Sequence, residues 1–254
     1  MAVIVMLFGG ALAGGLAASL RGPAGTRTGA AWVAVVADPS FVDALVFTVR
    51  TAVVATVLAA LLAIPVAALI RDHVWARVGL GLPVLVPHLV VAVTAALWLS
   101  PGGLADRMLG GLPVDLVGDR AGIGVIAVYV YKELPFLALL TAAAWTPAVR
   151  RRQEAAAVLG AGRLRAFTTV VWPAVRMPLV AGSLIVAAFV VGAFEVPLIV
   201  GPTYPPTLAT LALEHTRSVE LAGQARAAAL LLLTSGLALL LALPAARAAR
   251  HADA

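Results

Sequence analysis

The chain has 254 residues, of which 62% are hydrophobic and only 12% are charged, and its mean hydropathy is +1.04. A typical soluble domain is roughly 45–50% apolar and about 25% charged, so this composition excludes an ordinary water-soluble globular protein. The formal net charge is +6, and the chain contains no cysteine, which excludes a disulfide framework, a thiolate metal site and a cysteine nucleophile.

Six long apolar runs follow one another along the chain. Each run is long enough to cross a hydrocarbon core of ~30 Å at ~1.5 Å per helical residue. We therefore expect an all-α, polytopic membrane protein in which residues 1–254 form a single transmembrane domain. The expected spans are residues 2–20, 51–70, 79–99, 122–146, 179–200 and 227–245.

The residues that most enzyme sites require are absent or scattered. Lys132 is the only lysine and has no glycine beside it, so the chain contains no Walker A phosphate loop. The four histidines, His73, His88, His215 and His251, are far apart in the sequence, and no zinc-protease or serine-hydrolase motif occurs. We expect no enzyme activity, no metal site and no cofactor.

Lysine and arginine are distributed unevenly between the two sets of loops. One set carries 10 basic residues and the other carries 5, so the positive-inside rule places the richer set, and both chain termini, in the cytoplasm. This distribution explains the net charge without a nucleic-acid partner. Arg21 and Arg27 alone favour the opposite orientation for the first run, which also has some features of a signal peptide but lacks its basic start. The richer loops are residues 71–78, 147–178 and 246–254, and the poorer loops are residues 21–41, 101–121 and 201–224.

The longest cytoplasmic loop, residues 147–178, has a pattern of its own. Pro147 is suited to the first turn of a helix, and residues 154–159 are strong helix formers. Gly160 and Gly162 then permit a sharp stop or reversal. Apolar residues then recur at helical spacing, at Leu164, Phe167, Val170 and Val171, and indicate a second, amphipathic helix near the membrane surface. Pro173 and Pro178 limit this helix.

This loop resembles a known family signature. The residues Glu154-Ala155-Ala156, then Gly160, then Val170-x-Trp172-Pro173 follow the pattern E-A-A-x(3)-G-x(9)-I-x-L-P. That pattern belongs to the permease subunits of binding-protein-dependent ABC importers with the type I importer fold. Val170 replaces Ile and Trp172 replaces Leu, whereas Pro173 keeps its place. The resemblance covers roughly residues 45–245, and Gly192–Pro197 is similar to members near the polyamine, iron and thiamine permeases.

The resemblance implies a mechanism and a set of partners. In this family, the segment is a coupling helix that docks into a separate ATPase subunit, so Glu154 would be a polar contact, Ala155 and Ala156 a packing surface, and Gly160 the turn. It also implies two ATPase subunits, a second permease of the same or another kind, an extracytoplasmic solute-binding protein and a location in the cell inner membrane. Two alternatives remain: a basic helix that only meets anionic lipid, and a secondary transporter driven by an ion gradient.

Three charged residues lie at membrane depth, where ionisable groups are costly and are functional candidates. Lys132 and Glu133 are midway along the fourth run, and Glu195 is near the outer end of the fifth. One hypothesis is that these residues line the translocation pathway, where Glu133 and Glu195 would favour a polar or cationic solute. The alternative is that they tie helices together, and a contact between Lys132 and Glu195 is possible from their positions.

Overall fold

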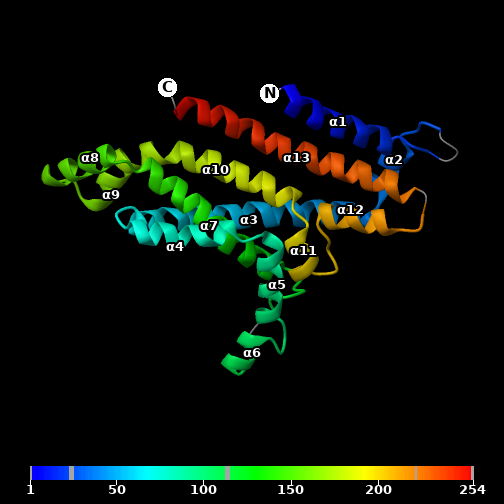
Figure 1. The fold of residues 1–254 in the computed structure, drawn as a ribbon, viewed down its shortest axis with the longest axis horizontal. Coiled ribbons are helices and arrows are strands. Elements are labelled where there is room, and N and C mark those ends of the chain that lie inside the picture. Colours follow the sequence, from blue (N-terminus) through cyan, green and yellow to red (C-terminus); the bar gives the residue numbers. More distant parts are fainter. Residues whose placement is uncertain (1, 23–25, 112–114, 221, 253–254) are drawn as a thin grey trace.

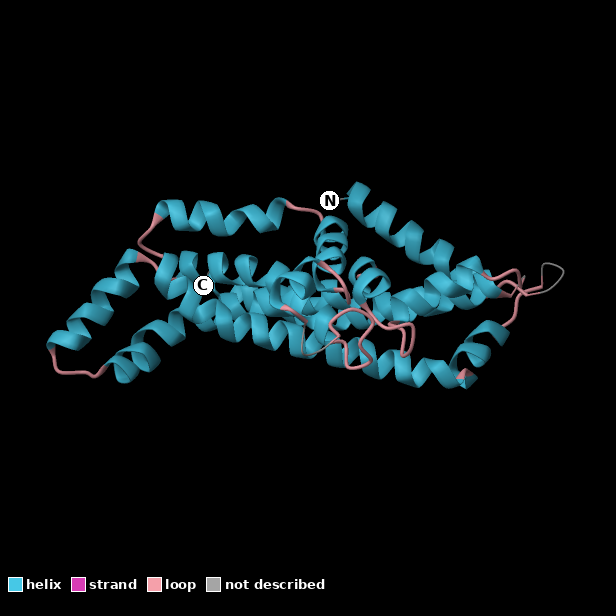
Figure 2. Cartoon of the chain, turned by 90° about the horizontal axis from the view of Figure 1, so that it is seen from below, coloured by secondary structure: helices cyan, strands magenta, loops and turns pink. Residues whose placement is uncertain are grey.

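The computed structural model describes residues 2–22, 26–111, 115–220 and 222–252, which form an elongated bundle of helices joined by loops (Figures 1 and 2). Five helical segments in this part of the chain are long and apolar enough to cross a membrane. The first expected span forms the helix α1 (Ala2–Ser19). Its apolar stretch Met6–Ser19 is shorter than a membrane span and is not one of the five segments. The five segments are Pro39–Ile70, His88–Leu109, Ile123–Ala144, Arg163–Gly192 and Gly223–Pro244.

The second expected span is the end of a longer helix, α3 (Pro39–Ile70). Its start is set by Asp38, whose side chain accepts a hydrogen bond of 2.8 Å from the backbone N–H of Ser40, and by Pro39 in the first turn. At ~1.5 Å per residue, this helix is about 48 Å long and exceeds a hydrocarbon core of ~30 Å.

The outer half of α3 is surrounded by short helices and by the start of the last helix. The helices α2 (Ala30–Ala37) and α12 (Leu208–Arg217) pack there with α13 (Gly223–Ala252). This outer layer has its own buried cluster, which comprises Val35, Ala44, Leu208, Leu211, Ala212, Ala229 and Leu230.

The third expected span, residues 79–99, is not one helix. The structure divides it into α4 (Val74–Leu85) and α5 (His88–Leu99), which is followed by the short helix α6 (Leu104–Leu109). Because Pro87 has no N–H, it cannot donate to the carbonyl of Pro83 and continue the helix. Figure 1 shows α5 and α6 projecting from the side of the bundle.

The fourth span, α7 (Ile123–Ala144), agrees with the expected residues 122–146. The loop after it, residues 147–178, begins with α8 (Pro147–Val158) and α9 (Arg163–Ala166). The expectation that Pro173 and Pro178 limit a separate amphipathic helix is wrong, because the chain continues through a π-helical turn at Phe167–Val171 into α10 (Trp172–Gly192). In that turn, the N–H of Trp172 bonds the carbonyl of Phe167, five residues back, which shifts the pairing register just before Pro173.

The fifth expected span, residues 179–200, also ends earlier than its apolar run. Helix α10 stops at Gly192, and Ala193 is extended before α11 (Glu195–Val200) begins. Pro197 lacks the N–H that would pair with the carbonyl of Ala193, but a proline is tolerated in the first turn of a new helix. The proline therefore favours a break at this point.

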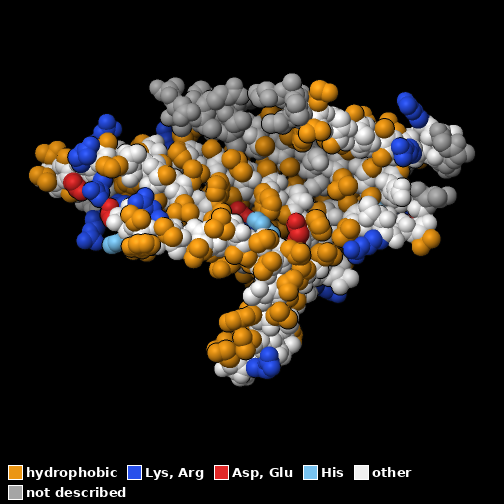
Figure 3. All heavy atoms as spheres, viewed as in Figure 1, with side chains coloured by type: hydrophobic (Ala, Val, Ile, Leu, Met, Phe, Trp, Pro, Cys, Tyr) orange, Lys and Arg blue, Asp and Glu red, His pale blue; other side chains and the backbone are white. Residues whose placement is uncertain are grey.

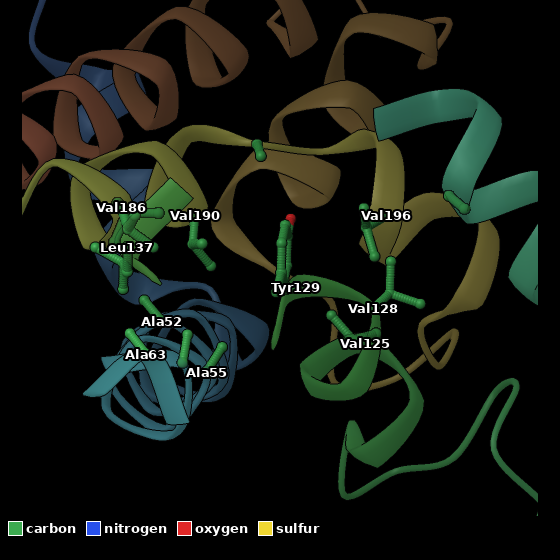
Figure 4. Close-up of a cluster of buried hydrophobic side chains, with 14 of the residues drawn as sticks. Ala52, Ala55, Ala63, Val125, Val128, Tyr129, Leu137, Val186, Val190 and Val196 are labelled. Atoms are coloured by element: carbon green, nitrogen blue, oxygen red, sulfur yellow. The ribbon is translucent and has the colours of Figure 1, made fainter. Parts of the chain in front are cut away.

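The core lies where α3, α7 and α10 meet, and it is made largely of small side chains. Figure 4 shows Ala52, Ala55 and Ala63 of α3 near Leu137 of α7 and Val186 of α10. Small residues let helix backbones approach closely, as is usual for helices packed in a membrane. On the face of the molecule shown in Figure 3, hydrophobic side chains cover much of the surface between the two charged ends, as lipid contact requires.

Candidate functional site

Helix α8, which the sequence predicts to be cytoplasmic, is closed at both ends. At its start, Pro147 occupies the first turn, and the side chain of Thr146 accepts a hydrogen bond of 3.4 Å from the N–H of Val149. At its end, the N–H groups of Gly160 and Ala161 donate to the carbonyls of Ala157 (3.0 Å) and Ala156 (2.9 Å), which is the pattern of a Schellman motif.

The glycine at position 160 is required by the backbone conformation of this motif. Its φ is +84°, in the left-handed region that residues with a Cβ rarely adopt. A Cβ built there would meet no atom within 4 Å. The demand for glycine is therefore conformational and not steric, and the spacing of Glu154, Ala155, Ala156 and Gly160 makes α8 a short helix with a defined end.

The base of α8 is anchored in a small hydrophobic cluster. Trp145 and Val149 pack with Val171 and Val175, which follow in the next helical segment, and Ala68 of α3 lies against this cluster. Because the cluster joins parts of α3, α7, α8 and α10, a displacement of α8 acts on several membrane helices at once.

Charged contacts reinforce this anchor. The guanidinium carbon of Arg71 lies 4.3 Å from the centre of the Trp145 ring, which is within the range of a cation–π contact. Arg150 of α8 forms an ion pair with Asp72, which follows α3 directly, and its Nε lies 3.6 Å from Glu154 Oε1. The exposed helix is thereby tied to the end of α3.

The ion pairs also shift the ionisation of Asp72. Desolvation alone would raise the pKa of this carboxyl, but a hydrogen bond from Arg71 and the positive charges of Arg150 and Arg71 outweigh it. The pKa of Asp72 therefore lies below its ordinary value. The carboxylate form, which holds α8, is the form that the surroundings favour.

The outward face of α8 is open to solvent. Glu154 is exposed with 65% of its side-chain surface, Ala155 is also exposed and Ala156 is half-buried. Beyond them, Val158, Leu159 and Leu164 form an apolar tip, with exposures of 88%, 87% and 77%. Figure 3 shows basic side chains gathered around this end of the molecule. Nearly fully exposed large apolar residues at the tip of a rigid helix indicate a protein-binding surface.

A second group of polar residues lies near the middle of the bundle. The Nε2 atom of His88, the first residue of α5, is 2.9 Å from Glu133 Oε1 of α7. Glu195 begins α11, and its Oε2 accepts a hydrogen bond of 3.2 Å from the N–H of Phe194. Both carboxylates lie within electrostatic range of Tyr129, whose buried hydroxyl has no hydrogen-bond partner among the described residues. Figure 3 shows two acidic side chains beside a histidine here.

Lys132 points to a different place. Its side chain is buried, and Nζ donates to the carbonyls of Pro83 (2.8 Å) and Val84 (3.1 Å) at the end of α4. Within the described ranges, the structure contains no ion pair between Lys132 and Glu195. The contacts of Lys132 therefore fit the helix-tying alternative. Glu133 and Glu195 do not contact Lys132 in this way, and both lie within electrostatic range of Tyr129.

His88 is the residue of this cluster that the sequence analysis did not single out. It lies inside the expected span 79–99 and is 45 residues from Glu133 in the chain. An ionisable side chain within an apolar run is itself a signal, but it does not identify its partner. The spacing of Pro83 and Pro87 contains the missing information, because two prolines four residues apart predict a broken helix. A polar residue directly after such a break is a candidate partner for a charge at the same depth.

The comparisons with known proteins agree with this structure. The chain is 30% identical over 184 residues to the inner membrane ABC transporter permease protein YnjC of Escherichia coli (strain K12), a match that includes 71% of this chain. It spans only about a third (36%) of the length of that protein. It is also 28% identical over 192 residues to the molybdenum transport system permease protein ModB of Azotobacter vinelandii, covering 70% of this chain and 82% of that protein. No protein-family model matches the chain.

Solved structures show the same fold. A chain of a bacterial alginate ABC transporter in complex with an alginate pentasaccharide-bound periplasmic protein superposes with a TM-score of 0.76 at 18% identity, covering 98% of this chain and 91% of that one. A chain of a bacterial ABC transporter involved in the import of the acidic polysaccharide alginate gives 0.69 at 19% identity, with coverages of 98% and 92%.

The sequence similarity and the shared fold point to one class of protein. Both sequence relatives are ABC transporter permease proteins, one of them an inner-membrane protein, and the chain has the fold of a chain from a bacterial ABC transporter that is solved with its periplasmic protein. Such permeases are transporter subunits and not enzymes, in agreement with what the composition predicts.

Proposed function

We propose that this chain forms one half of a solute pathway across the membrane, and that its Glu154–Gly160 segment couples the pathway to a separate ATPase subunit. The observation that supports this proposal most strongly is the construction of α8. The helix is closed at both ends, its base is packed against three other helical segments, and its tip is apolar and exposed. A helix of this kind transmits a displacement instead of absorbing it.

The proposed assembly contains two ATPase subunits, a second permease and an extracytoplasmic solute-binding protein, and it is surrounded by lipid. The second permease is supported by α5, which projects from the bundle, is almost entirely apolar and has only one buried residue, Ala92. A binding protein is supported by the alginate transporter, which is solved with a periplasmic protein. The loop charges favour cytoplasmic termini, as the coupling role of α8 requires.

A test of coupling is the substitution Gly160→Ala, with Gly162→Ala as its matched control. Alanine at position 160 is forced into the left-handed region and costs about 1 kcal/mol, which loosens the end of α8. Gly162 has an extended conformation and free space around it, so alanine is tolerated there. We expect Gly160→Ala to lower ATP-dependent uptake and ATPase co-purification with the permease, and Gly162→Ala to leave both close to the wild type.

Two results would contradict this proposal. One is equal uptake by the two alanine variants, together with a Glu154→Ala variant that still binds the ATPase and transports normally. The other is uptake that persists when no ATPase subunit is present and that follows an ion gradient, which would support the secondary-transporter alternative.

We further propose that Glu133 and Glu195 face the pathway and favour a small polar or cationic solute. Support comes from Glu195 at the start of the half-helix α11, and from Glu133 of α7, which contacts His88 at the start of α5. Both carboxylates lie within electrostatic range of the buried hydroxyl of Tyr129. Discontinuous helices are a common setting for solute sites in membrane transporters. The Gly192–Pro197 segment, with its break before Glu195, also supports a place near the polyamine, iron and thiamine permeases.

The substitution Glu195→Gln tests this pathway. If the carboxylate assists passage of a cation, its neutralisation lowers uptake by about tenfold, or roughly 1.4 kcal/mol. Glu214→Gln on the exposed face of α12 is the control, because it removes the same charge outside the pathway. Uptake of the solute bound by the partner binding protein is measured in proteoliposomes. Unchanged uptake in both Glu195→Gln and Glu133→Gln contradicts the pathway role.

A further inference from the structure

The break between α4 and α5 leaves backbone groups without partners in their own helix. Pro87 has no N–H to donate to the carbonyl of Pro83, which accepts one backbone bond of 3.3 Å from the N–H of Val86, and the last carbonyls of an α-helix lack i+4 donors. In a hydrocarbon environment, such groups need partners from the protein. The break therefore requires polar side chains from a neighbouring helix to hold its two ends.

Lys132 of α7 provides the partner on one side of the break. Its ammonium group lies 2.8 Å from the carbonyl oxygen of Pro83 and 3.1 Å from that of Val84, and its side chain is only 4% exposed. A cation at the C-terminus of a helix also interacts favourably with the helix dipole. The only lysine of the chain is thus used to close the end of α4.

Glu133, the next residue of α7, contacts the other side of the break through the side chain of the first residue of α5. Its Oε1 lies 2.9 Å from Nε2 of that residue, His88. The His88 ring packs against the ring of Phe189 in α10, with 4.6 Å between the ring centres and an angle of 44° between the ring planes. Consecutive residues of a helix point in different directions. This difference in direction lets one residue reach α4 while its neighbour reaches α5.

The same helix leads directly to the coupling segment. After Ala144, α7 is followed by Trp145 and then by α8, and Trp145 is buried in the cluster that anchors α8. A displacement of α8 therefore reaches α7 directly, together with the ends of α3 and α10 that share the cluster. The two residues that hold the broken span are part of this helix, about 20 Å from its end at ~1.5 Å per residue.

We propose that Lys132 and Glu133 form a two-sided clamp that makes α4, α5 and α7 move as one body when α8 is displaced. Lys132 is then a positioning residue, which acts on the pathway through the broken span and does not touch the solute. This inference rests on the proposed coupling function of α8. It adds the route by which the movement of α8 reaches the middle of the membrane.

The first experiment compares Lys132→Met with Lys132→Arg in the assembled complex. Methionine removes the charged donor from two carbonyls, and we expect uptake per assembled complex to fall by about tenfold. Arginine can still donate to both carbonyls, so we expect it to retain most of the uptake. If Lys132→Met lowers only the amount of assembled complex, and uptake per complex equals that of the wild type, Lys132 has a purely structural role and the clamp is disproved.

The second experiment does not depend on the folding of a Lys132 variant. Val90 of α5 and Tyr131 of α7 line the same groove and are both exposed, and the chain has no natural cysteine. The pair Val90→Cys and Tyr131→Cys is joined with a short bifunctional thiol reagent that a reductant can cleave. If α5 and α7 move together, the cross-linked complex transports as well as the reduced one. Uptake that is lost on cross-linking and regained on reduction overturns the proposal.

These outcomes separate the clamp from the function on which it rests. The proposed function fails if the reduced, assembled complex shows no ATP-dependent uptake. The clamp fails if the reduced complex transports and the cross-linked complex does not.

Discussion

Asp72 and Arg150 join two segments that are 78 residues apart in the sequence. Both side chains are partly exposed, at 46% and 44%, so solvent screens their attraction and the contact adds little to the free energy of unfolding. Its importance is positional, because it fixes the direction in which α8 leaves the membrane. Such a pair is not predictable from the sequence, since several arginines of the loop are equally placed to meet the same carboxylate.

The lowered pKa of Asp72 predicts a pH dependence. A carboxyl whose pKa is lower in the folded protein contributes stability above its unfolded pKa, and this contribution is lost as the pH falls through the folded value. We expect the wild type to have a slightly higher unfolding temperature than Asp72→Asn at neutral pH, and the difference to vanish well below the ordinary pKa of 3.8. Thermal unfolding of the purified protein at several pH values measures this. A difference that grows on acidification contradicts it.

At the scale of the helices, the sequence predicts that a helix exists better than it predicts where that helix begins and ends. The span α7 was predicted almost to the residue, because its apolar run coincides with its hydrogen-bonded length. The broken spans were not, since hydropathy does not distinguish one apolar helix from two. Pro87 and Pro197 mark both breaks, and Asp38-Pro39 marks the true start of α3. The turn at Gly160 was predictable because a left-handed residue after a helix has a sequence preference of its own.

The alanine face of α3 gives a prediction at this scale. Ala59 is fully buried where α3 meets the other helices of the core, so Ala59→Leu forces them apart and costs ~1–3 kcal/mol. Val57→Leu adds a methylene on the exposed side of the same helix and is the control, because 49% of Val57 is exposed. Thermal unfolding in detergent should show a clear loss for the first variant only. Equal unfolding temperatures contradict the close packing of α3.

At the scale of the whole molecule, most basic residues lie toward the two ends of an apolar body, apart from those of the projecting part, while Lys132, Glu133 and Glu195 lie near its middle. This arrangement follows from the sequence alone, because basic residues avoid the membrane core and concentrate in loops. The projection of α5 and α6 does not follow from it. A helix that is apolar on all sides is compatible with lipid, with another helix of the same chain or with a second chain, and only three-dimensional packing distinguishes these environments.

The orientation of the molecule can be tested with single cysteines in the natural cysteine-free background. Leu159 at the end of α8 and Val219 between α12 and α13 are 87% and 101% exposed. We expect a membrane-impermeant maleimide to label Val219→Cys in intact spheroplasts and to label Leu159→Cys only after permeabilisation. The reverse pattern would place α8 outside the cell and would remove the basis for its contact with an ATPase.

The length of α3 has a consequence for the lipid in which the protein works. About 18 Å of this helix extends beyond a hydrocarbon layer of ~30 Å, and it carries the contact between Asp43 and Tyr204. A bilayer with longer acyl chains would submerge these polar groups, and the helix would have to tilt or the lipid to thin around it. Through this one long helix, the acyl-chain length of the host membrane determines how far the outer layer of helices rises above the headgroups.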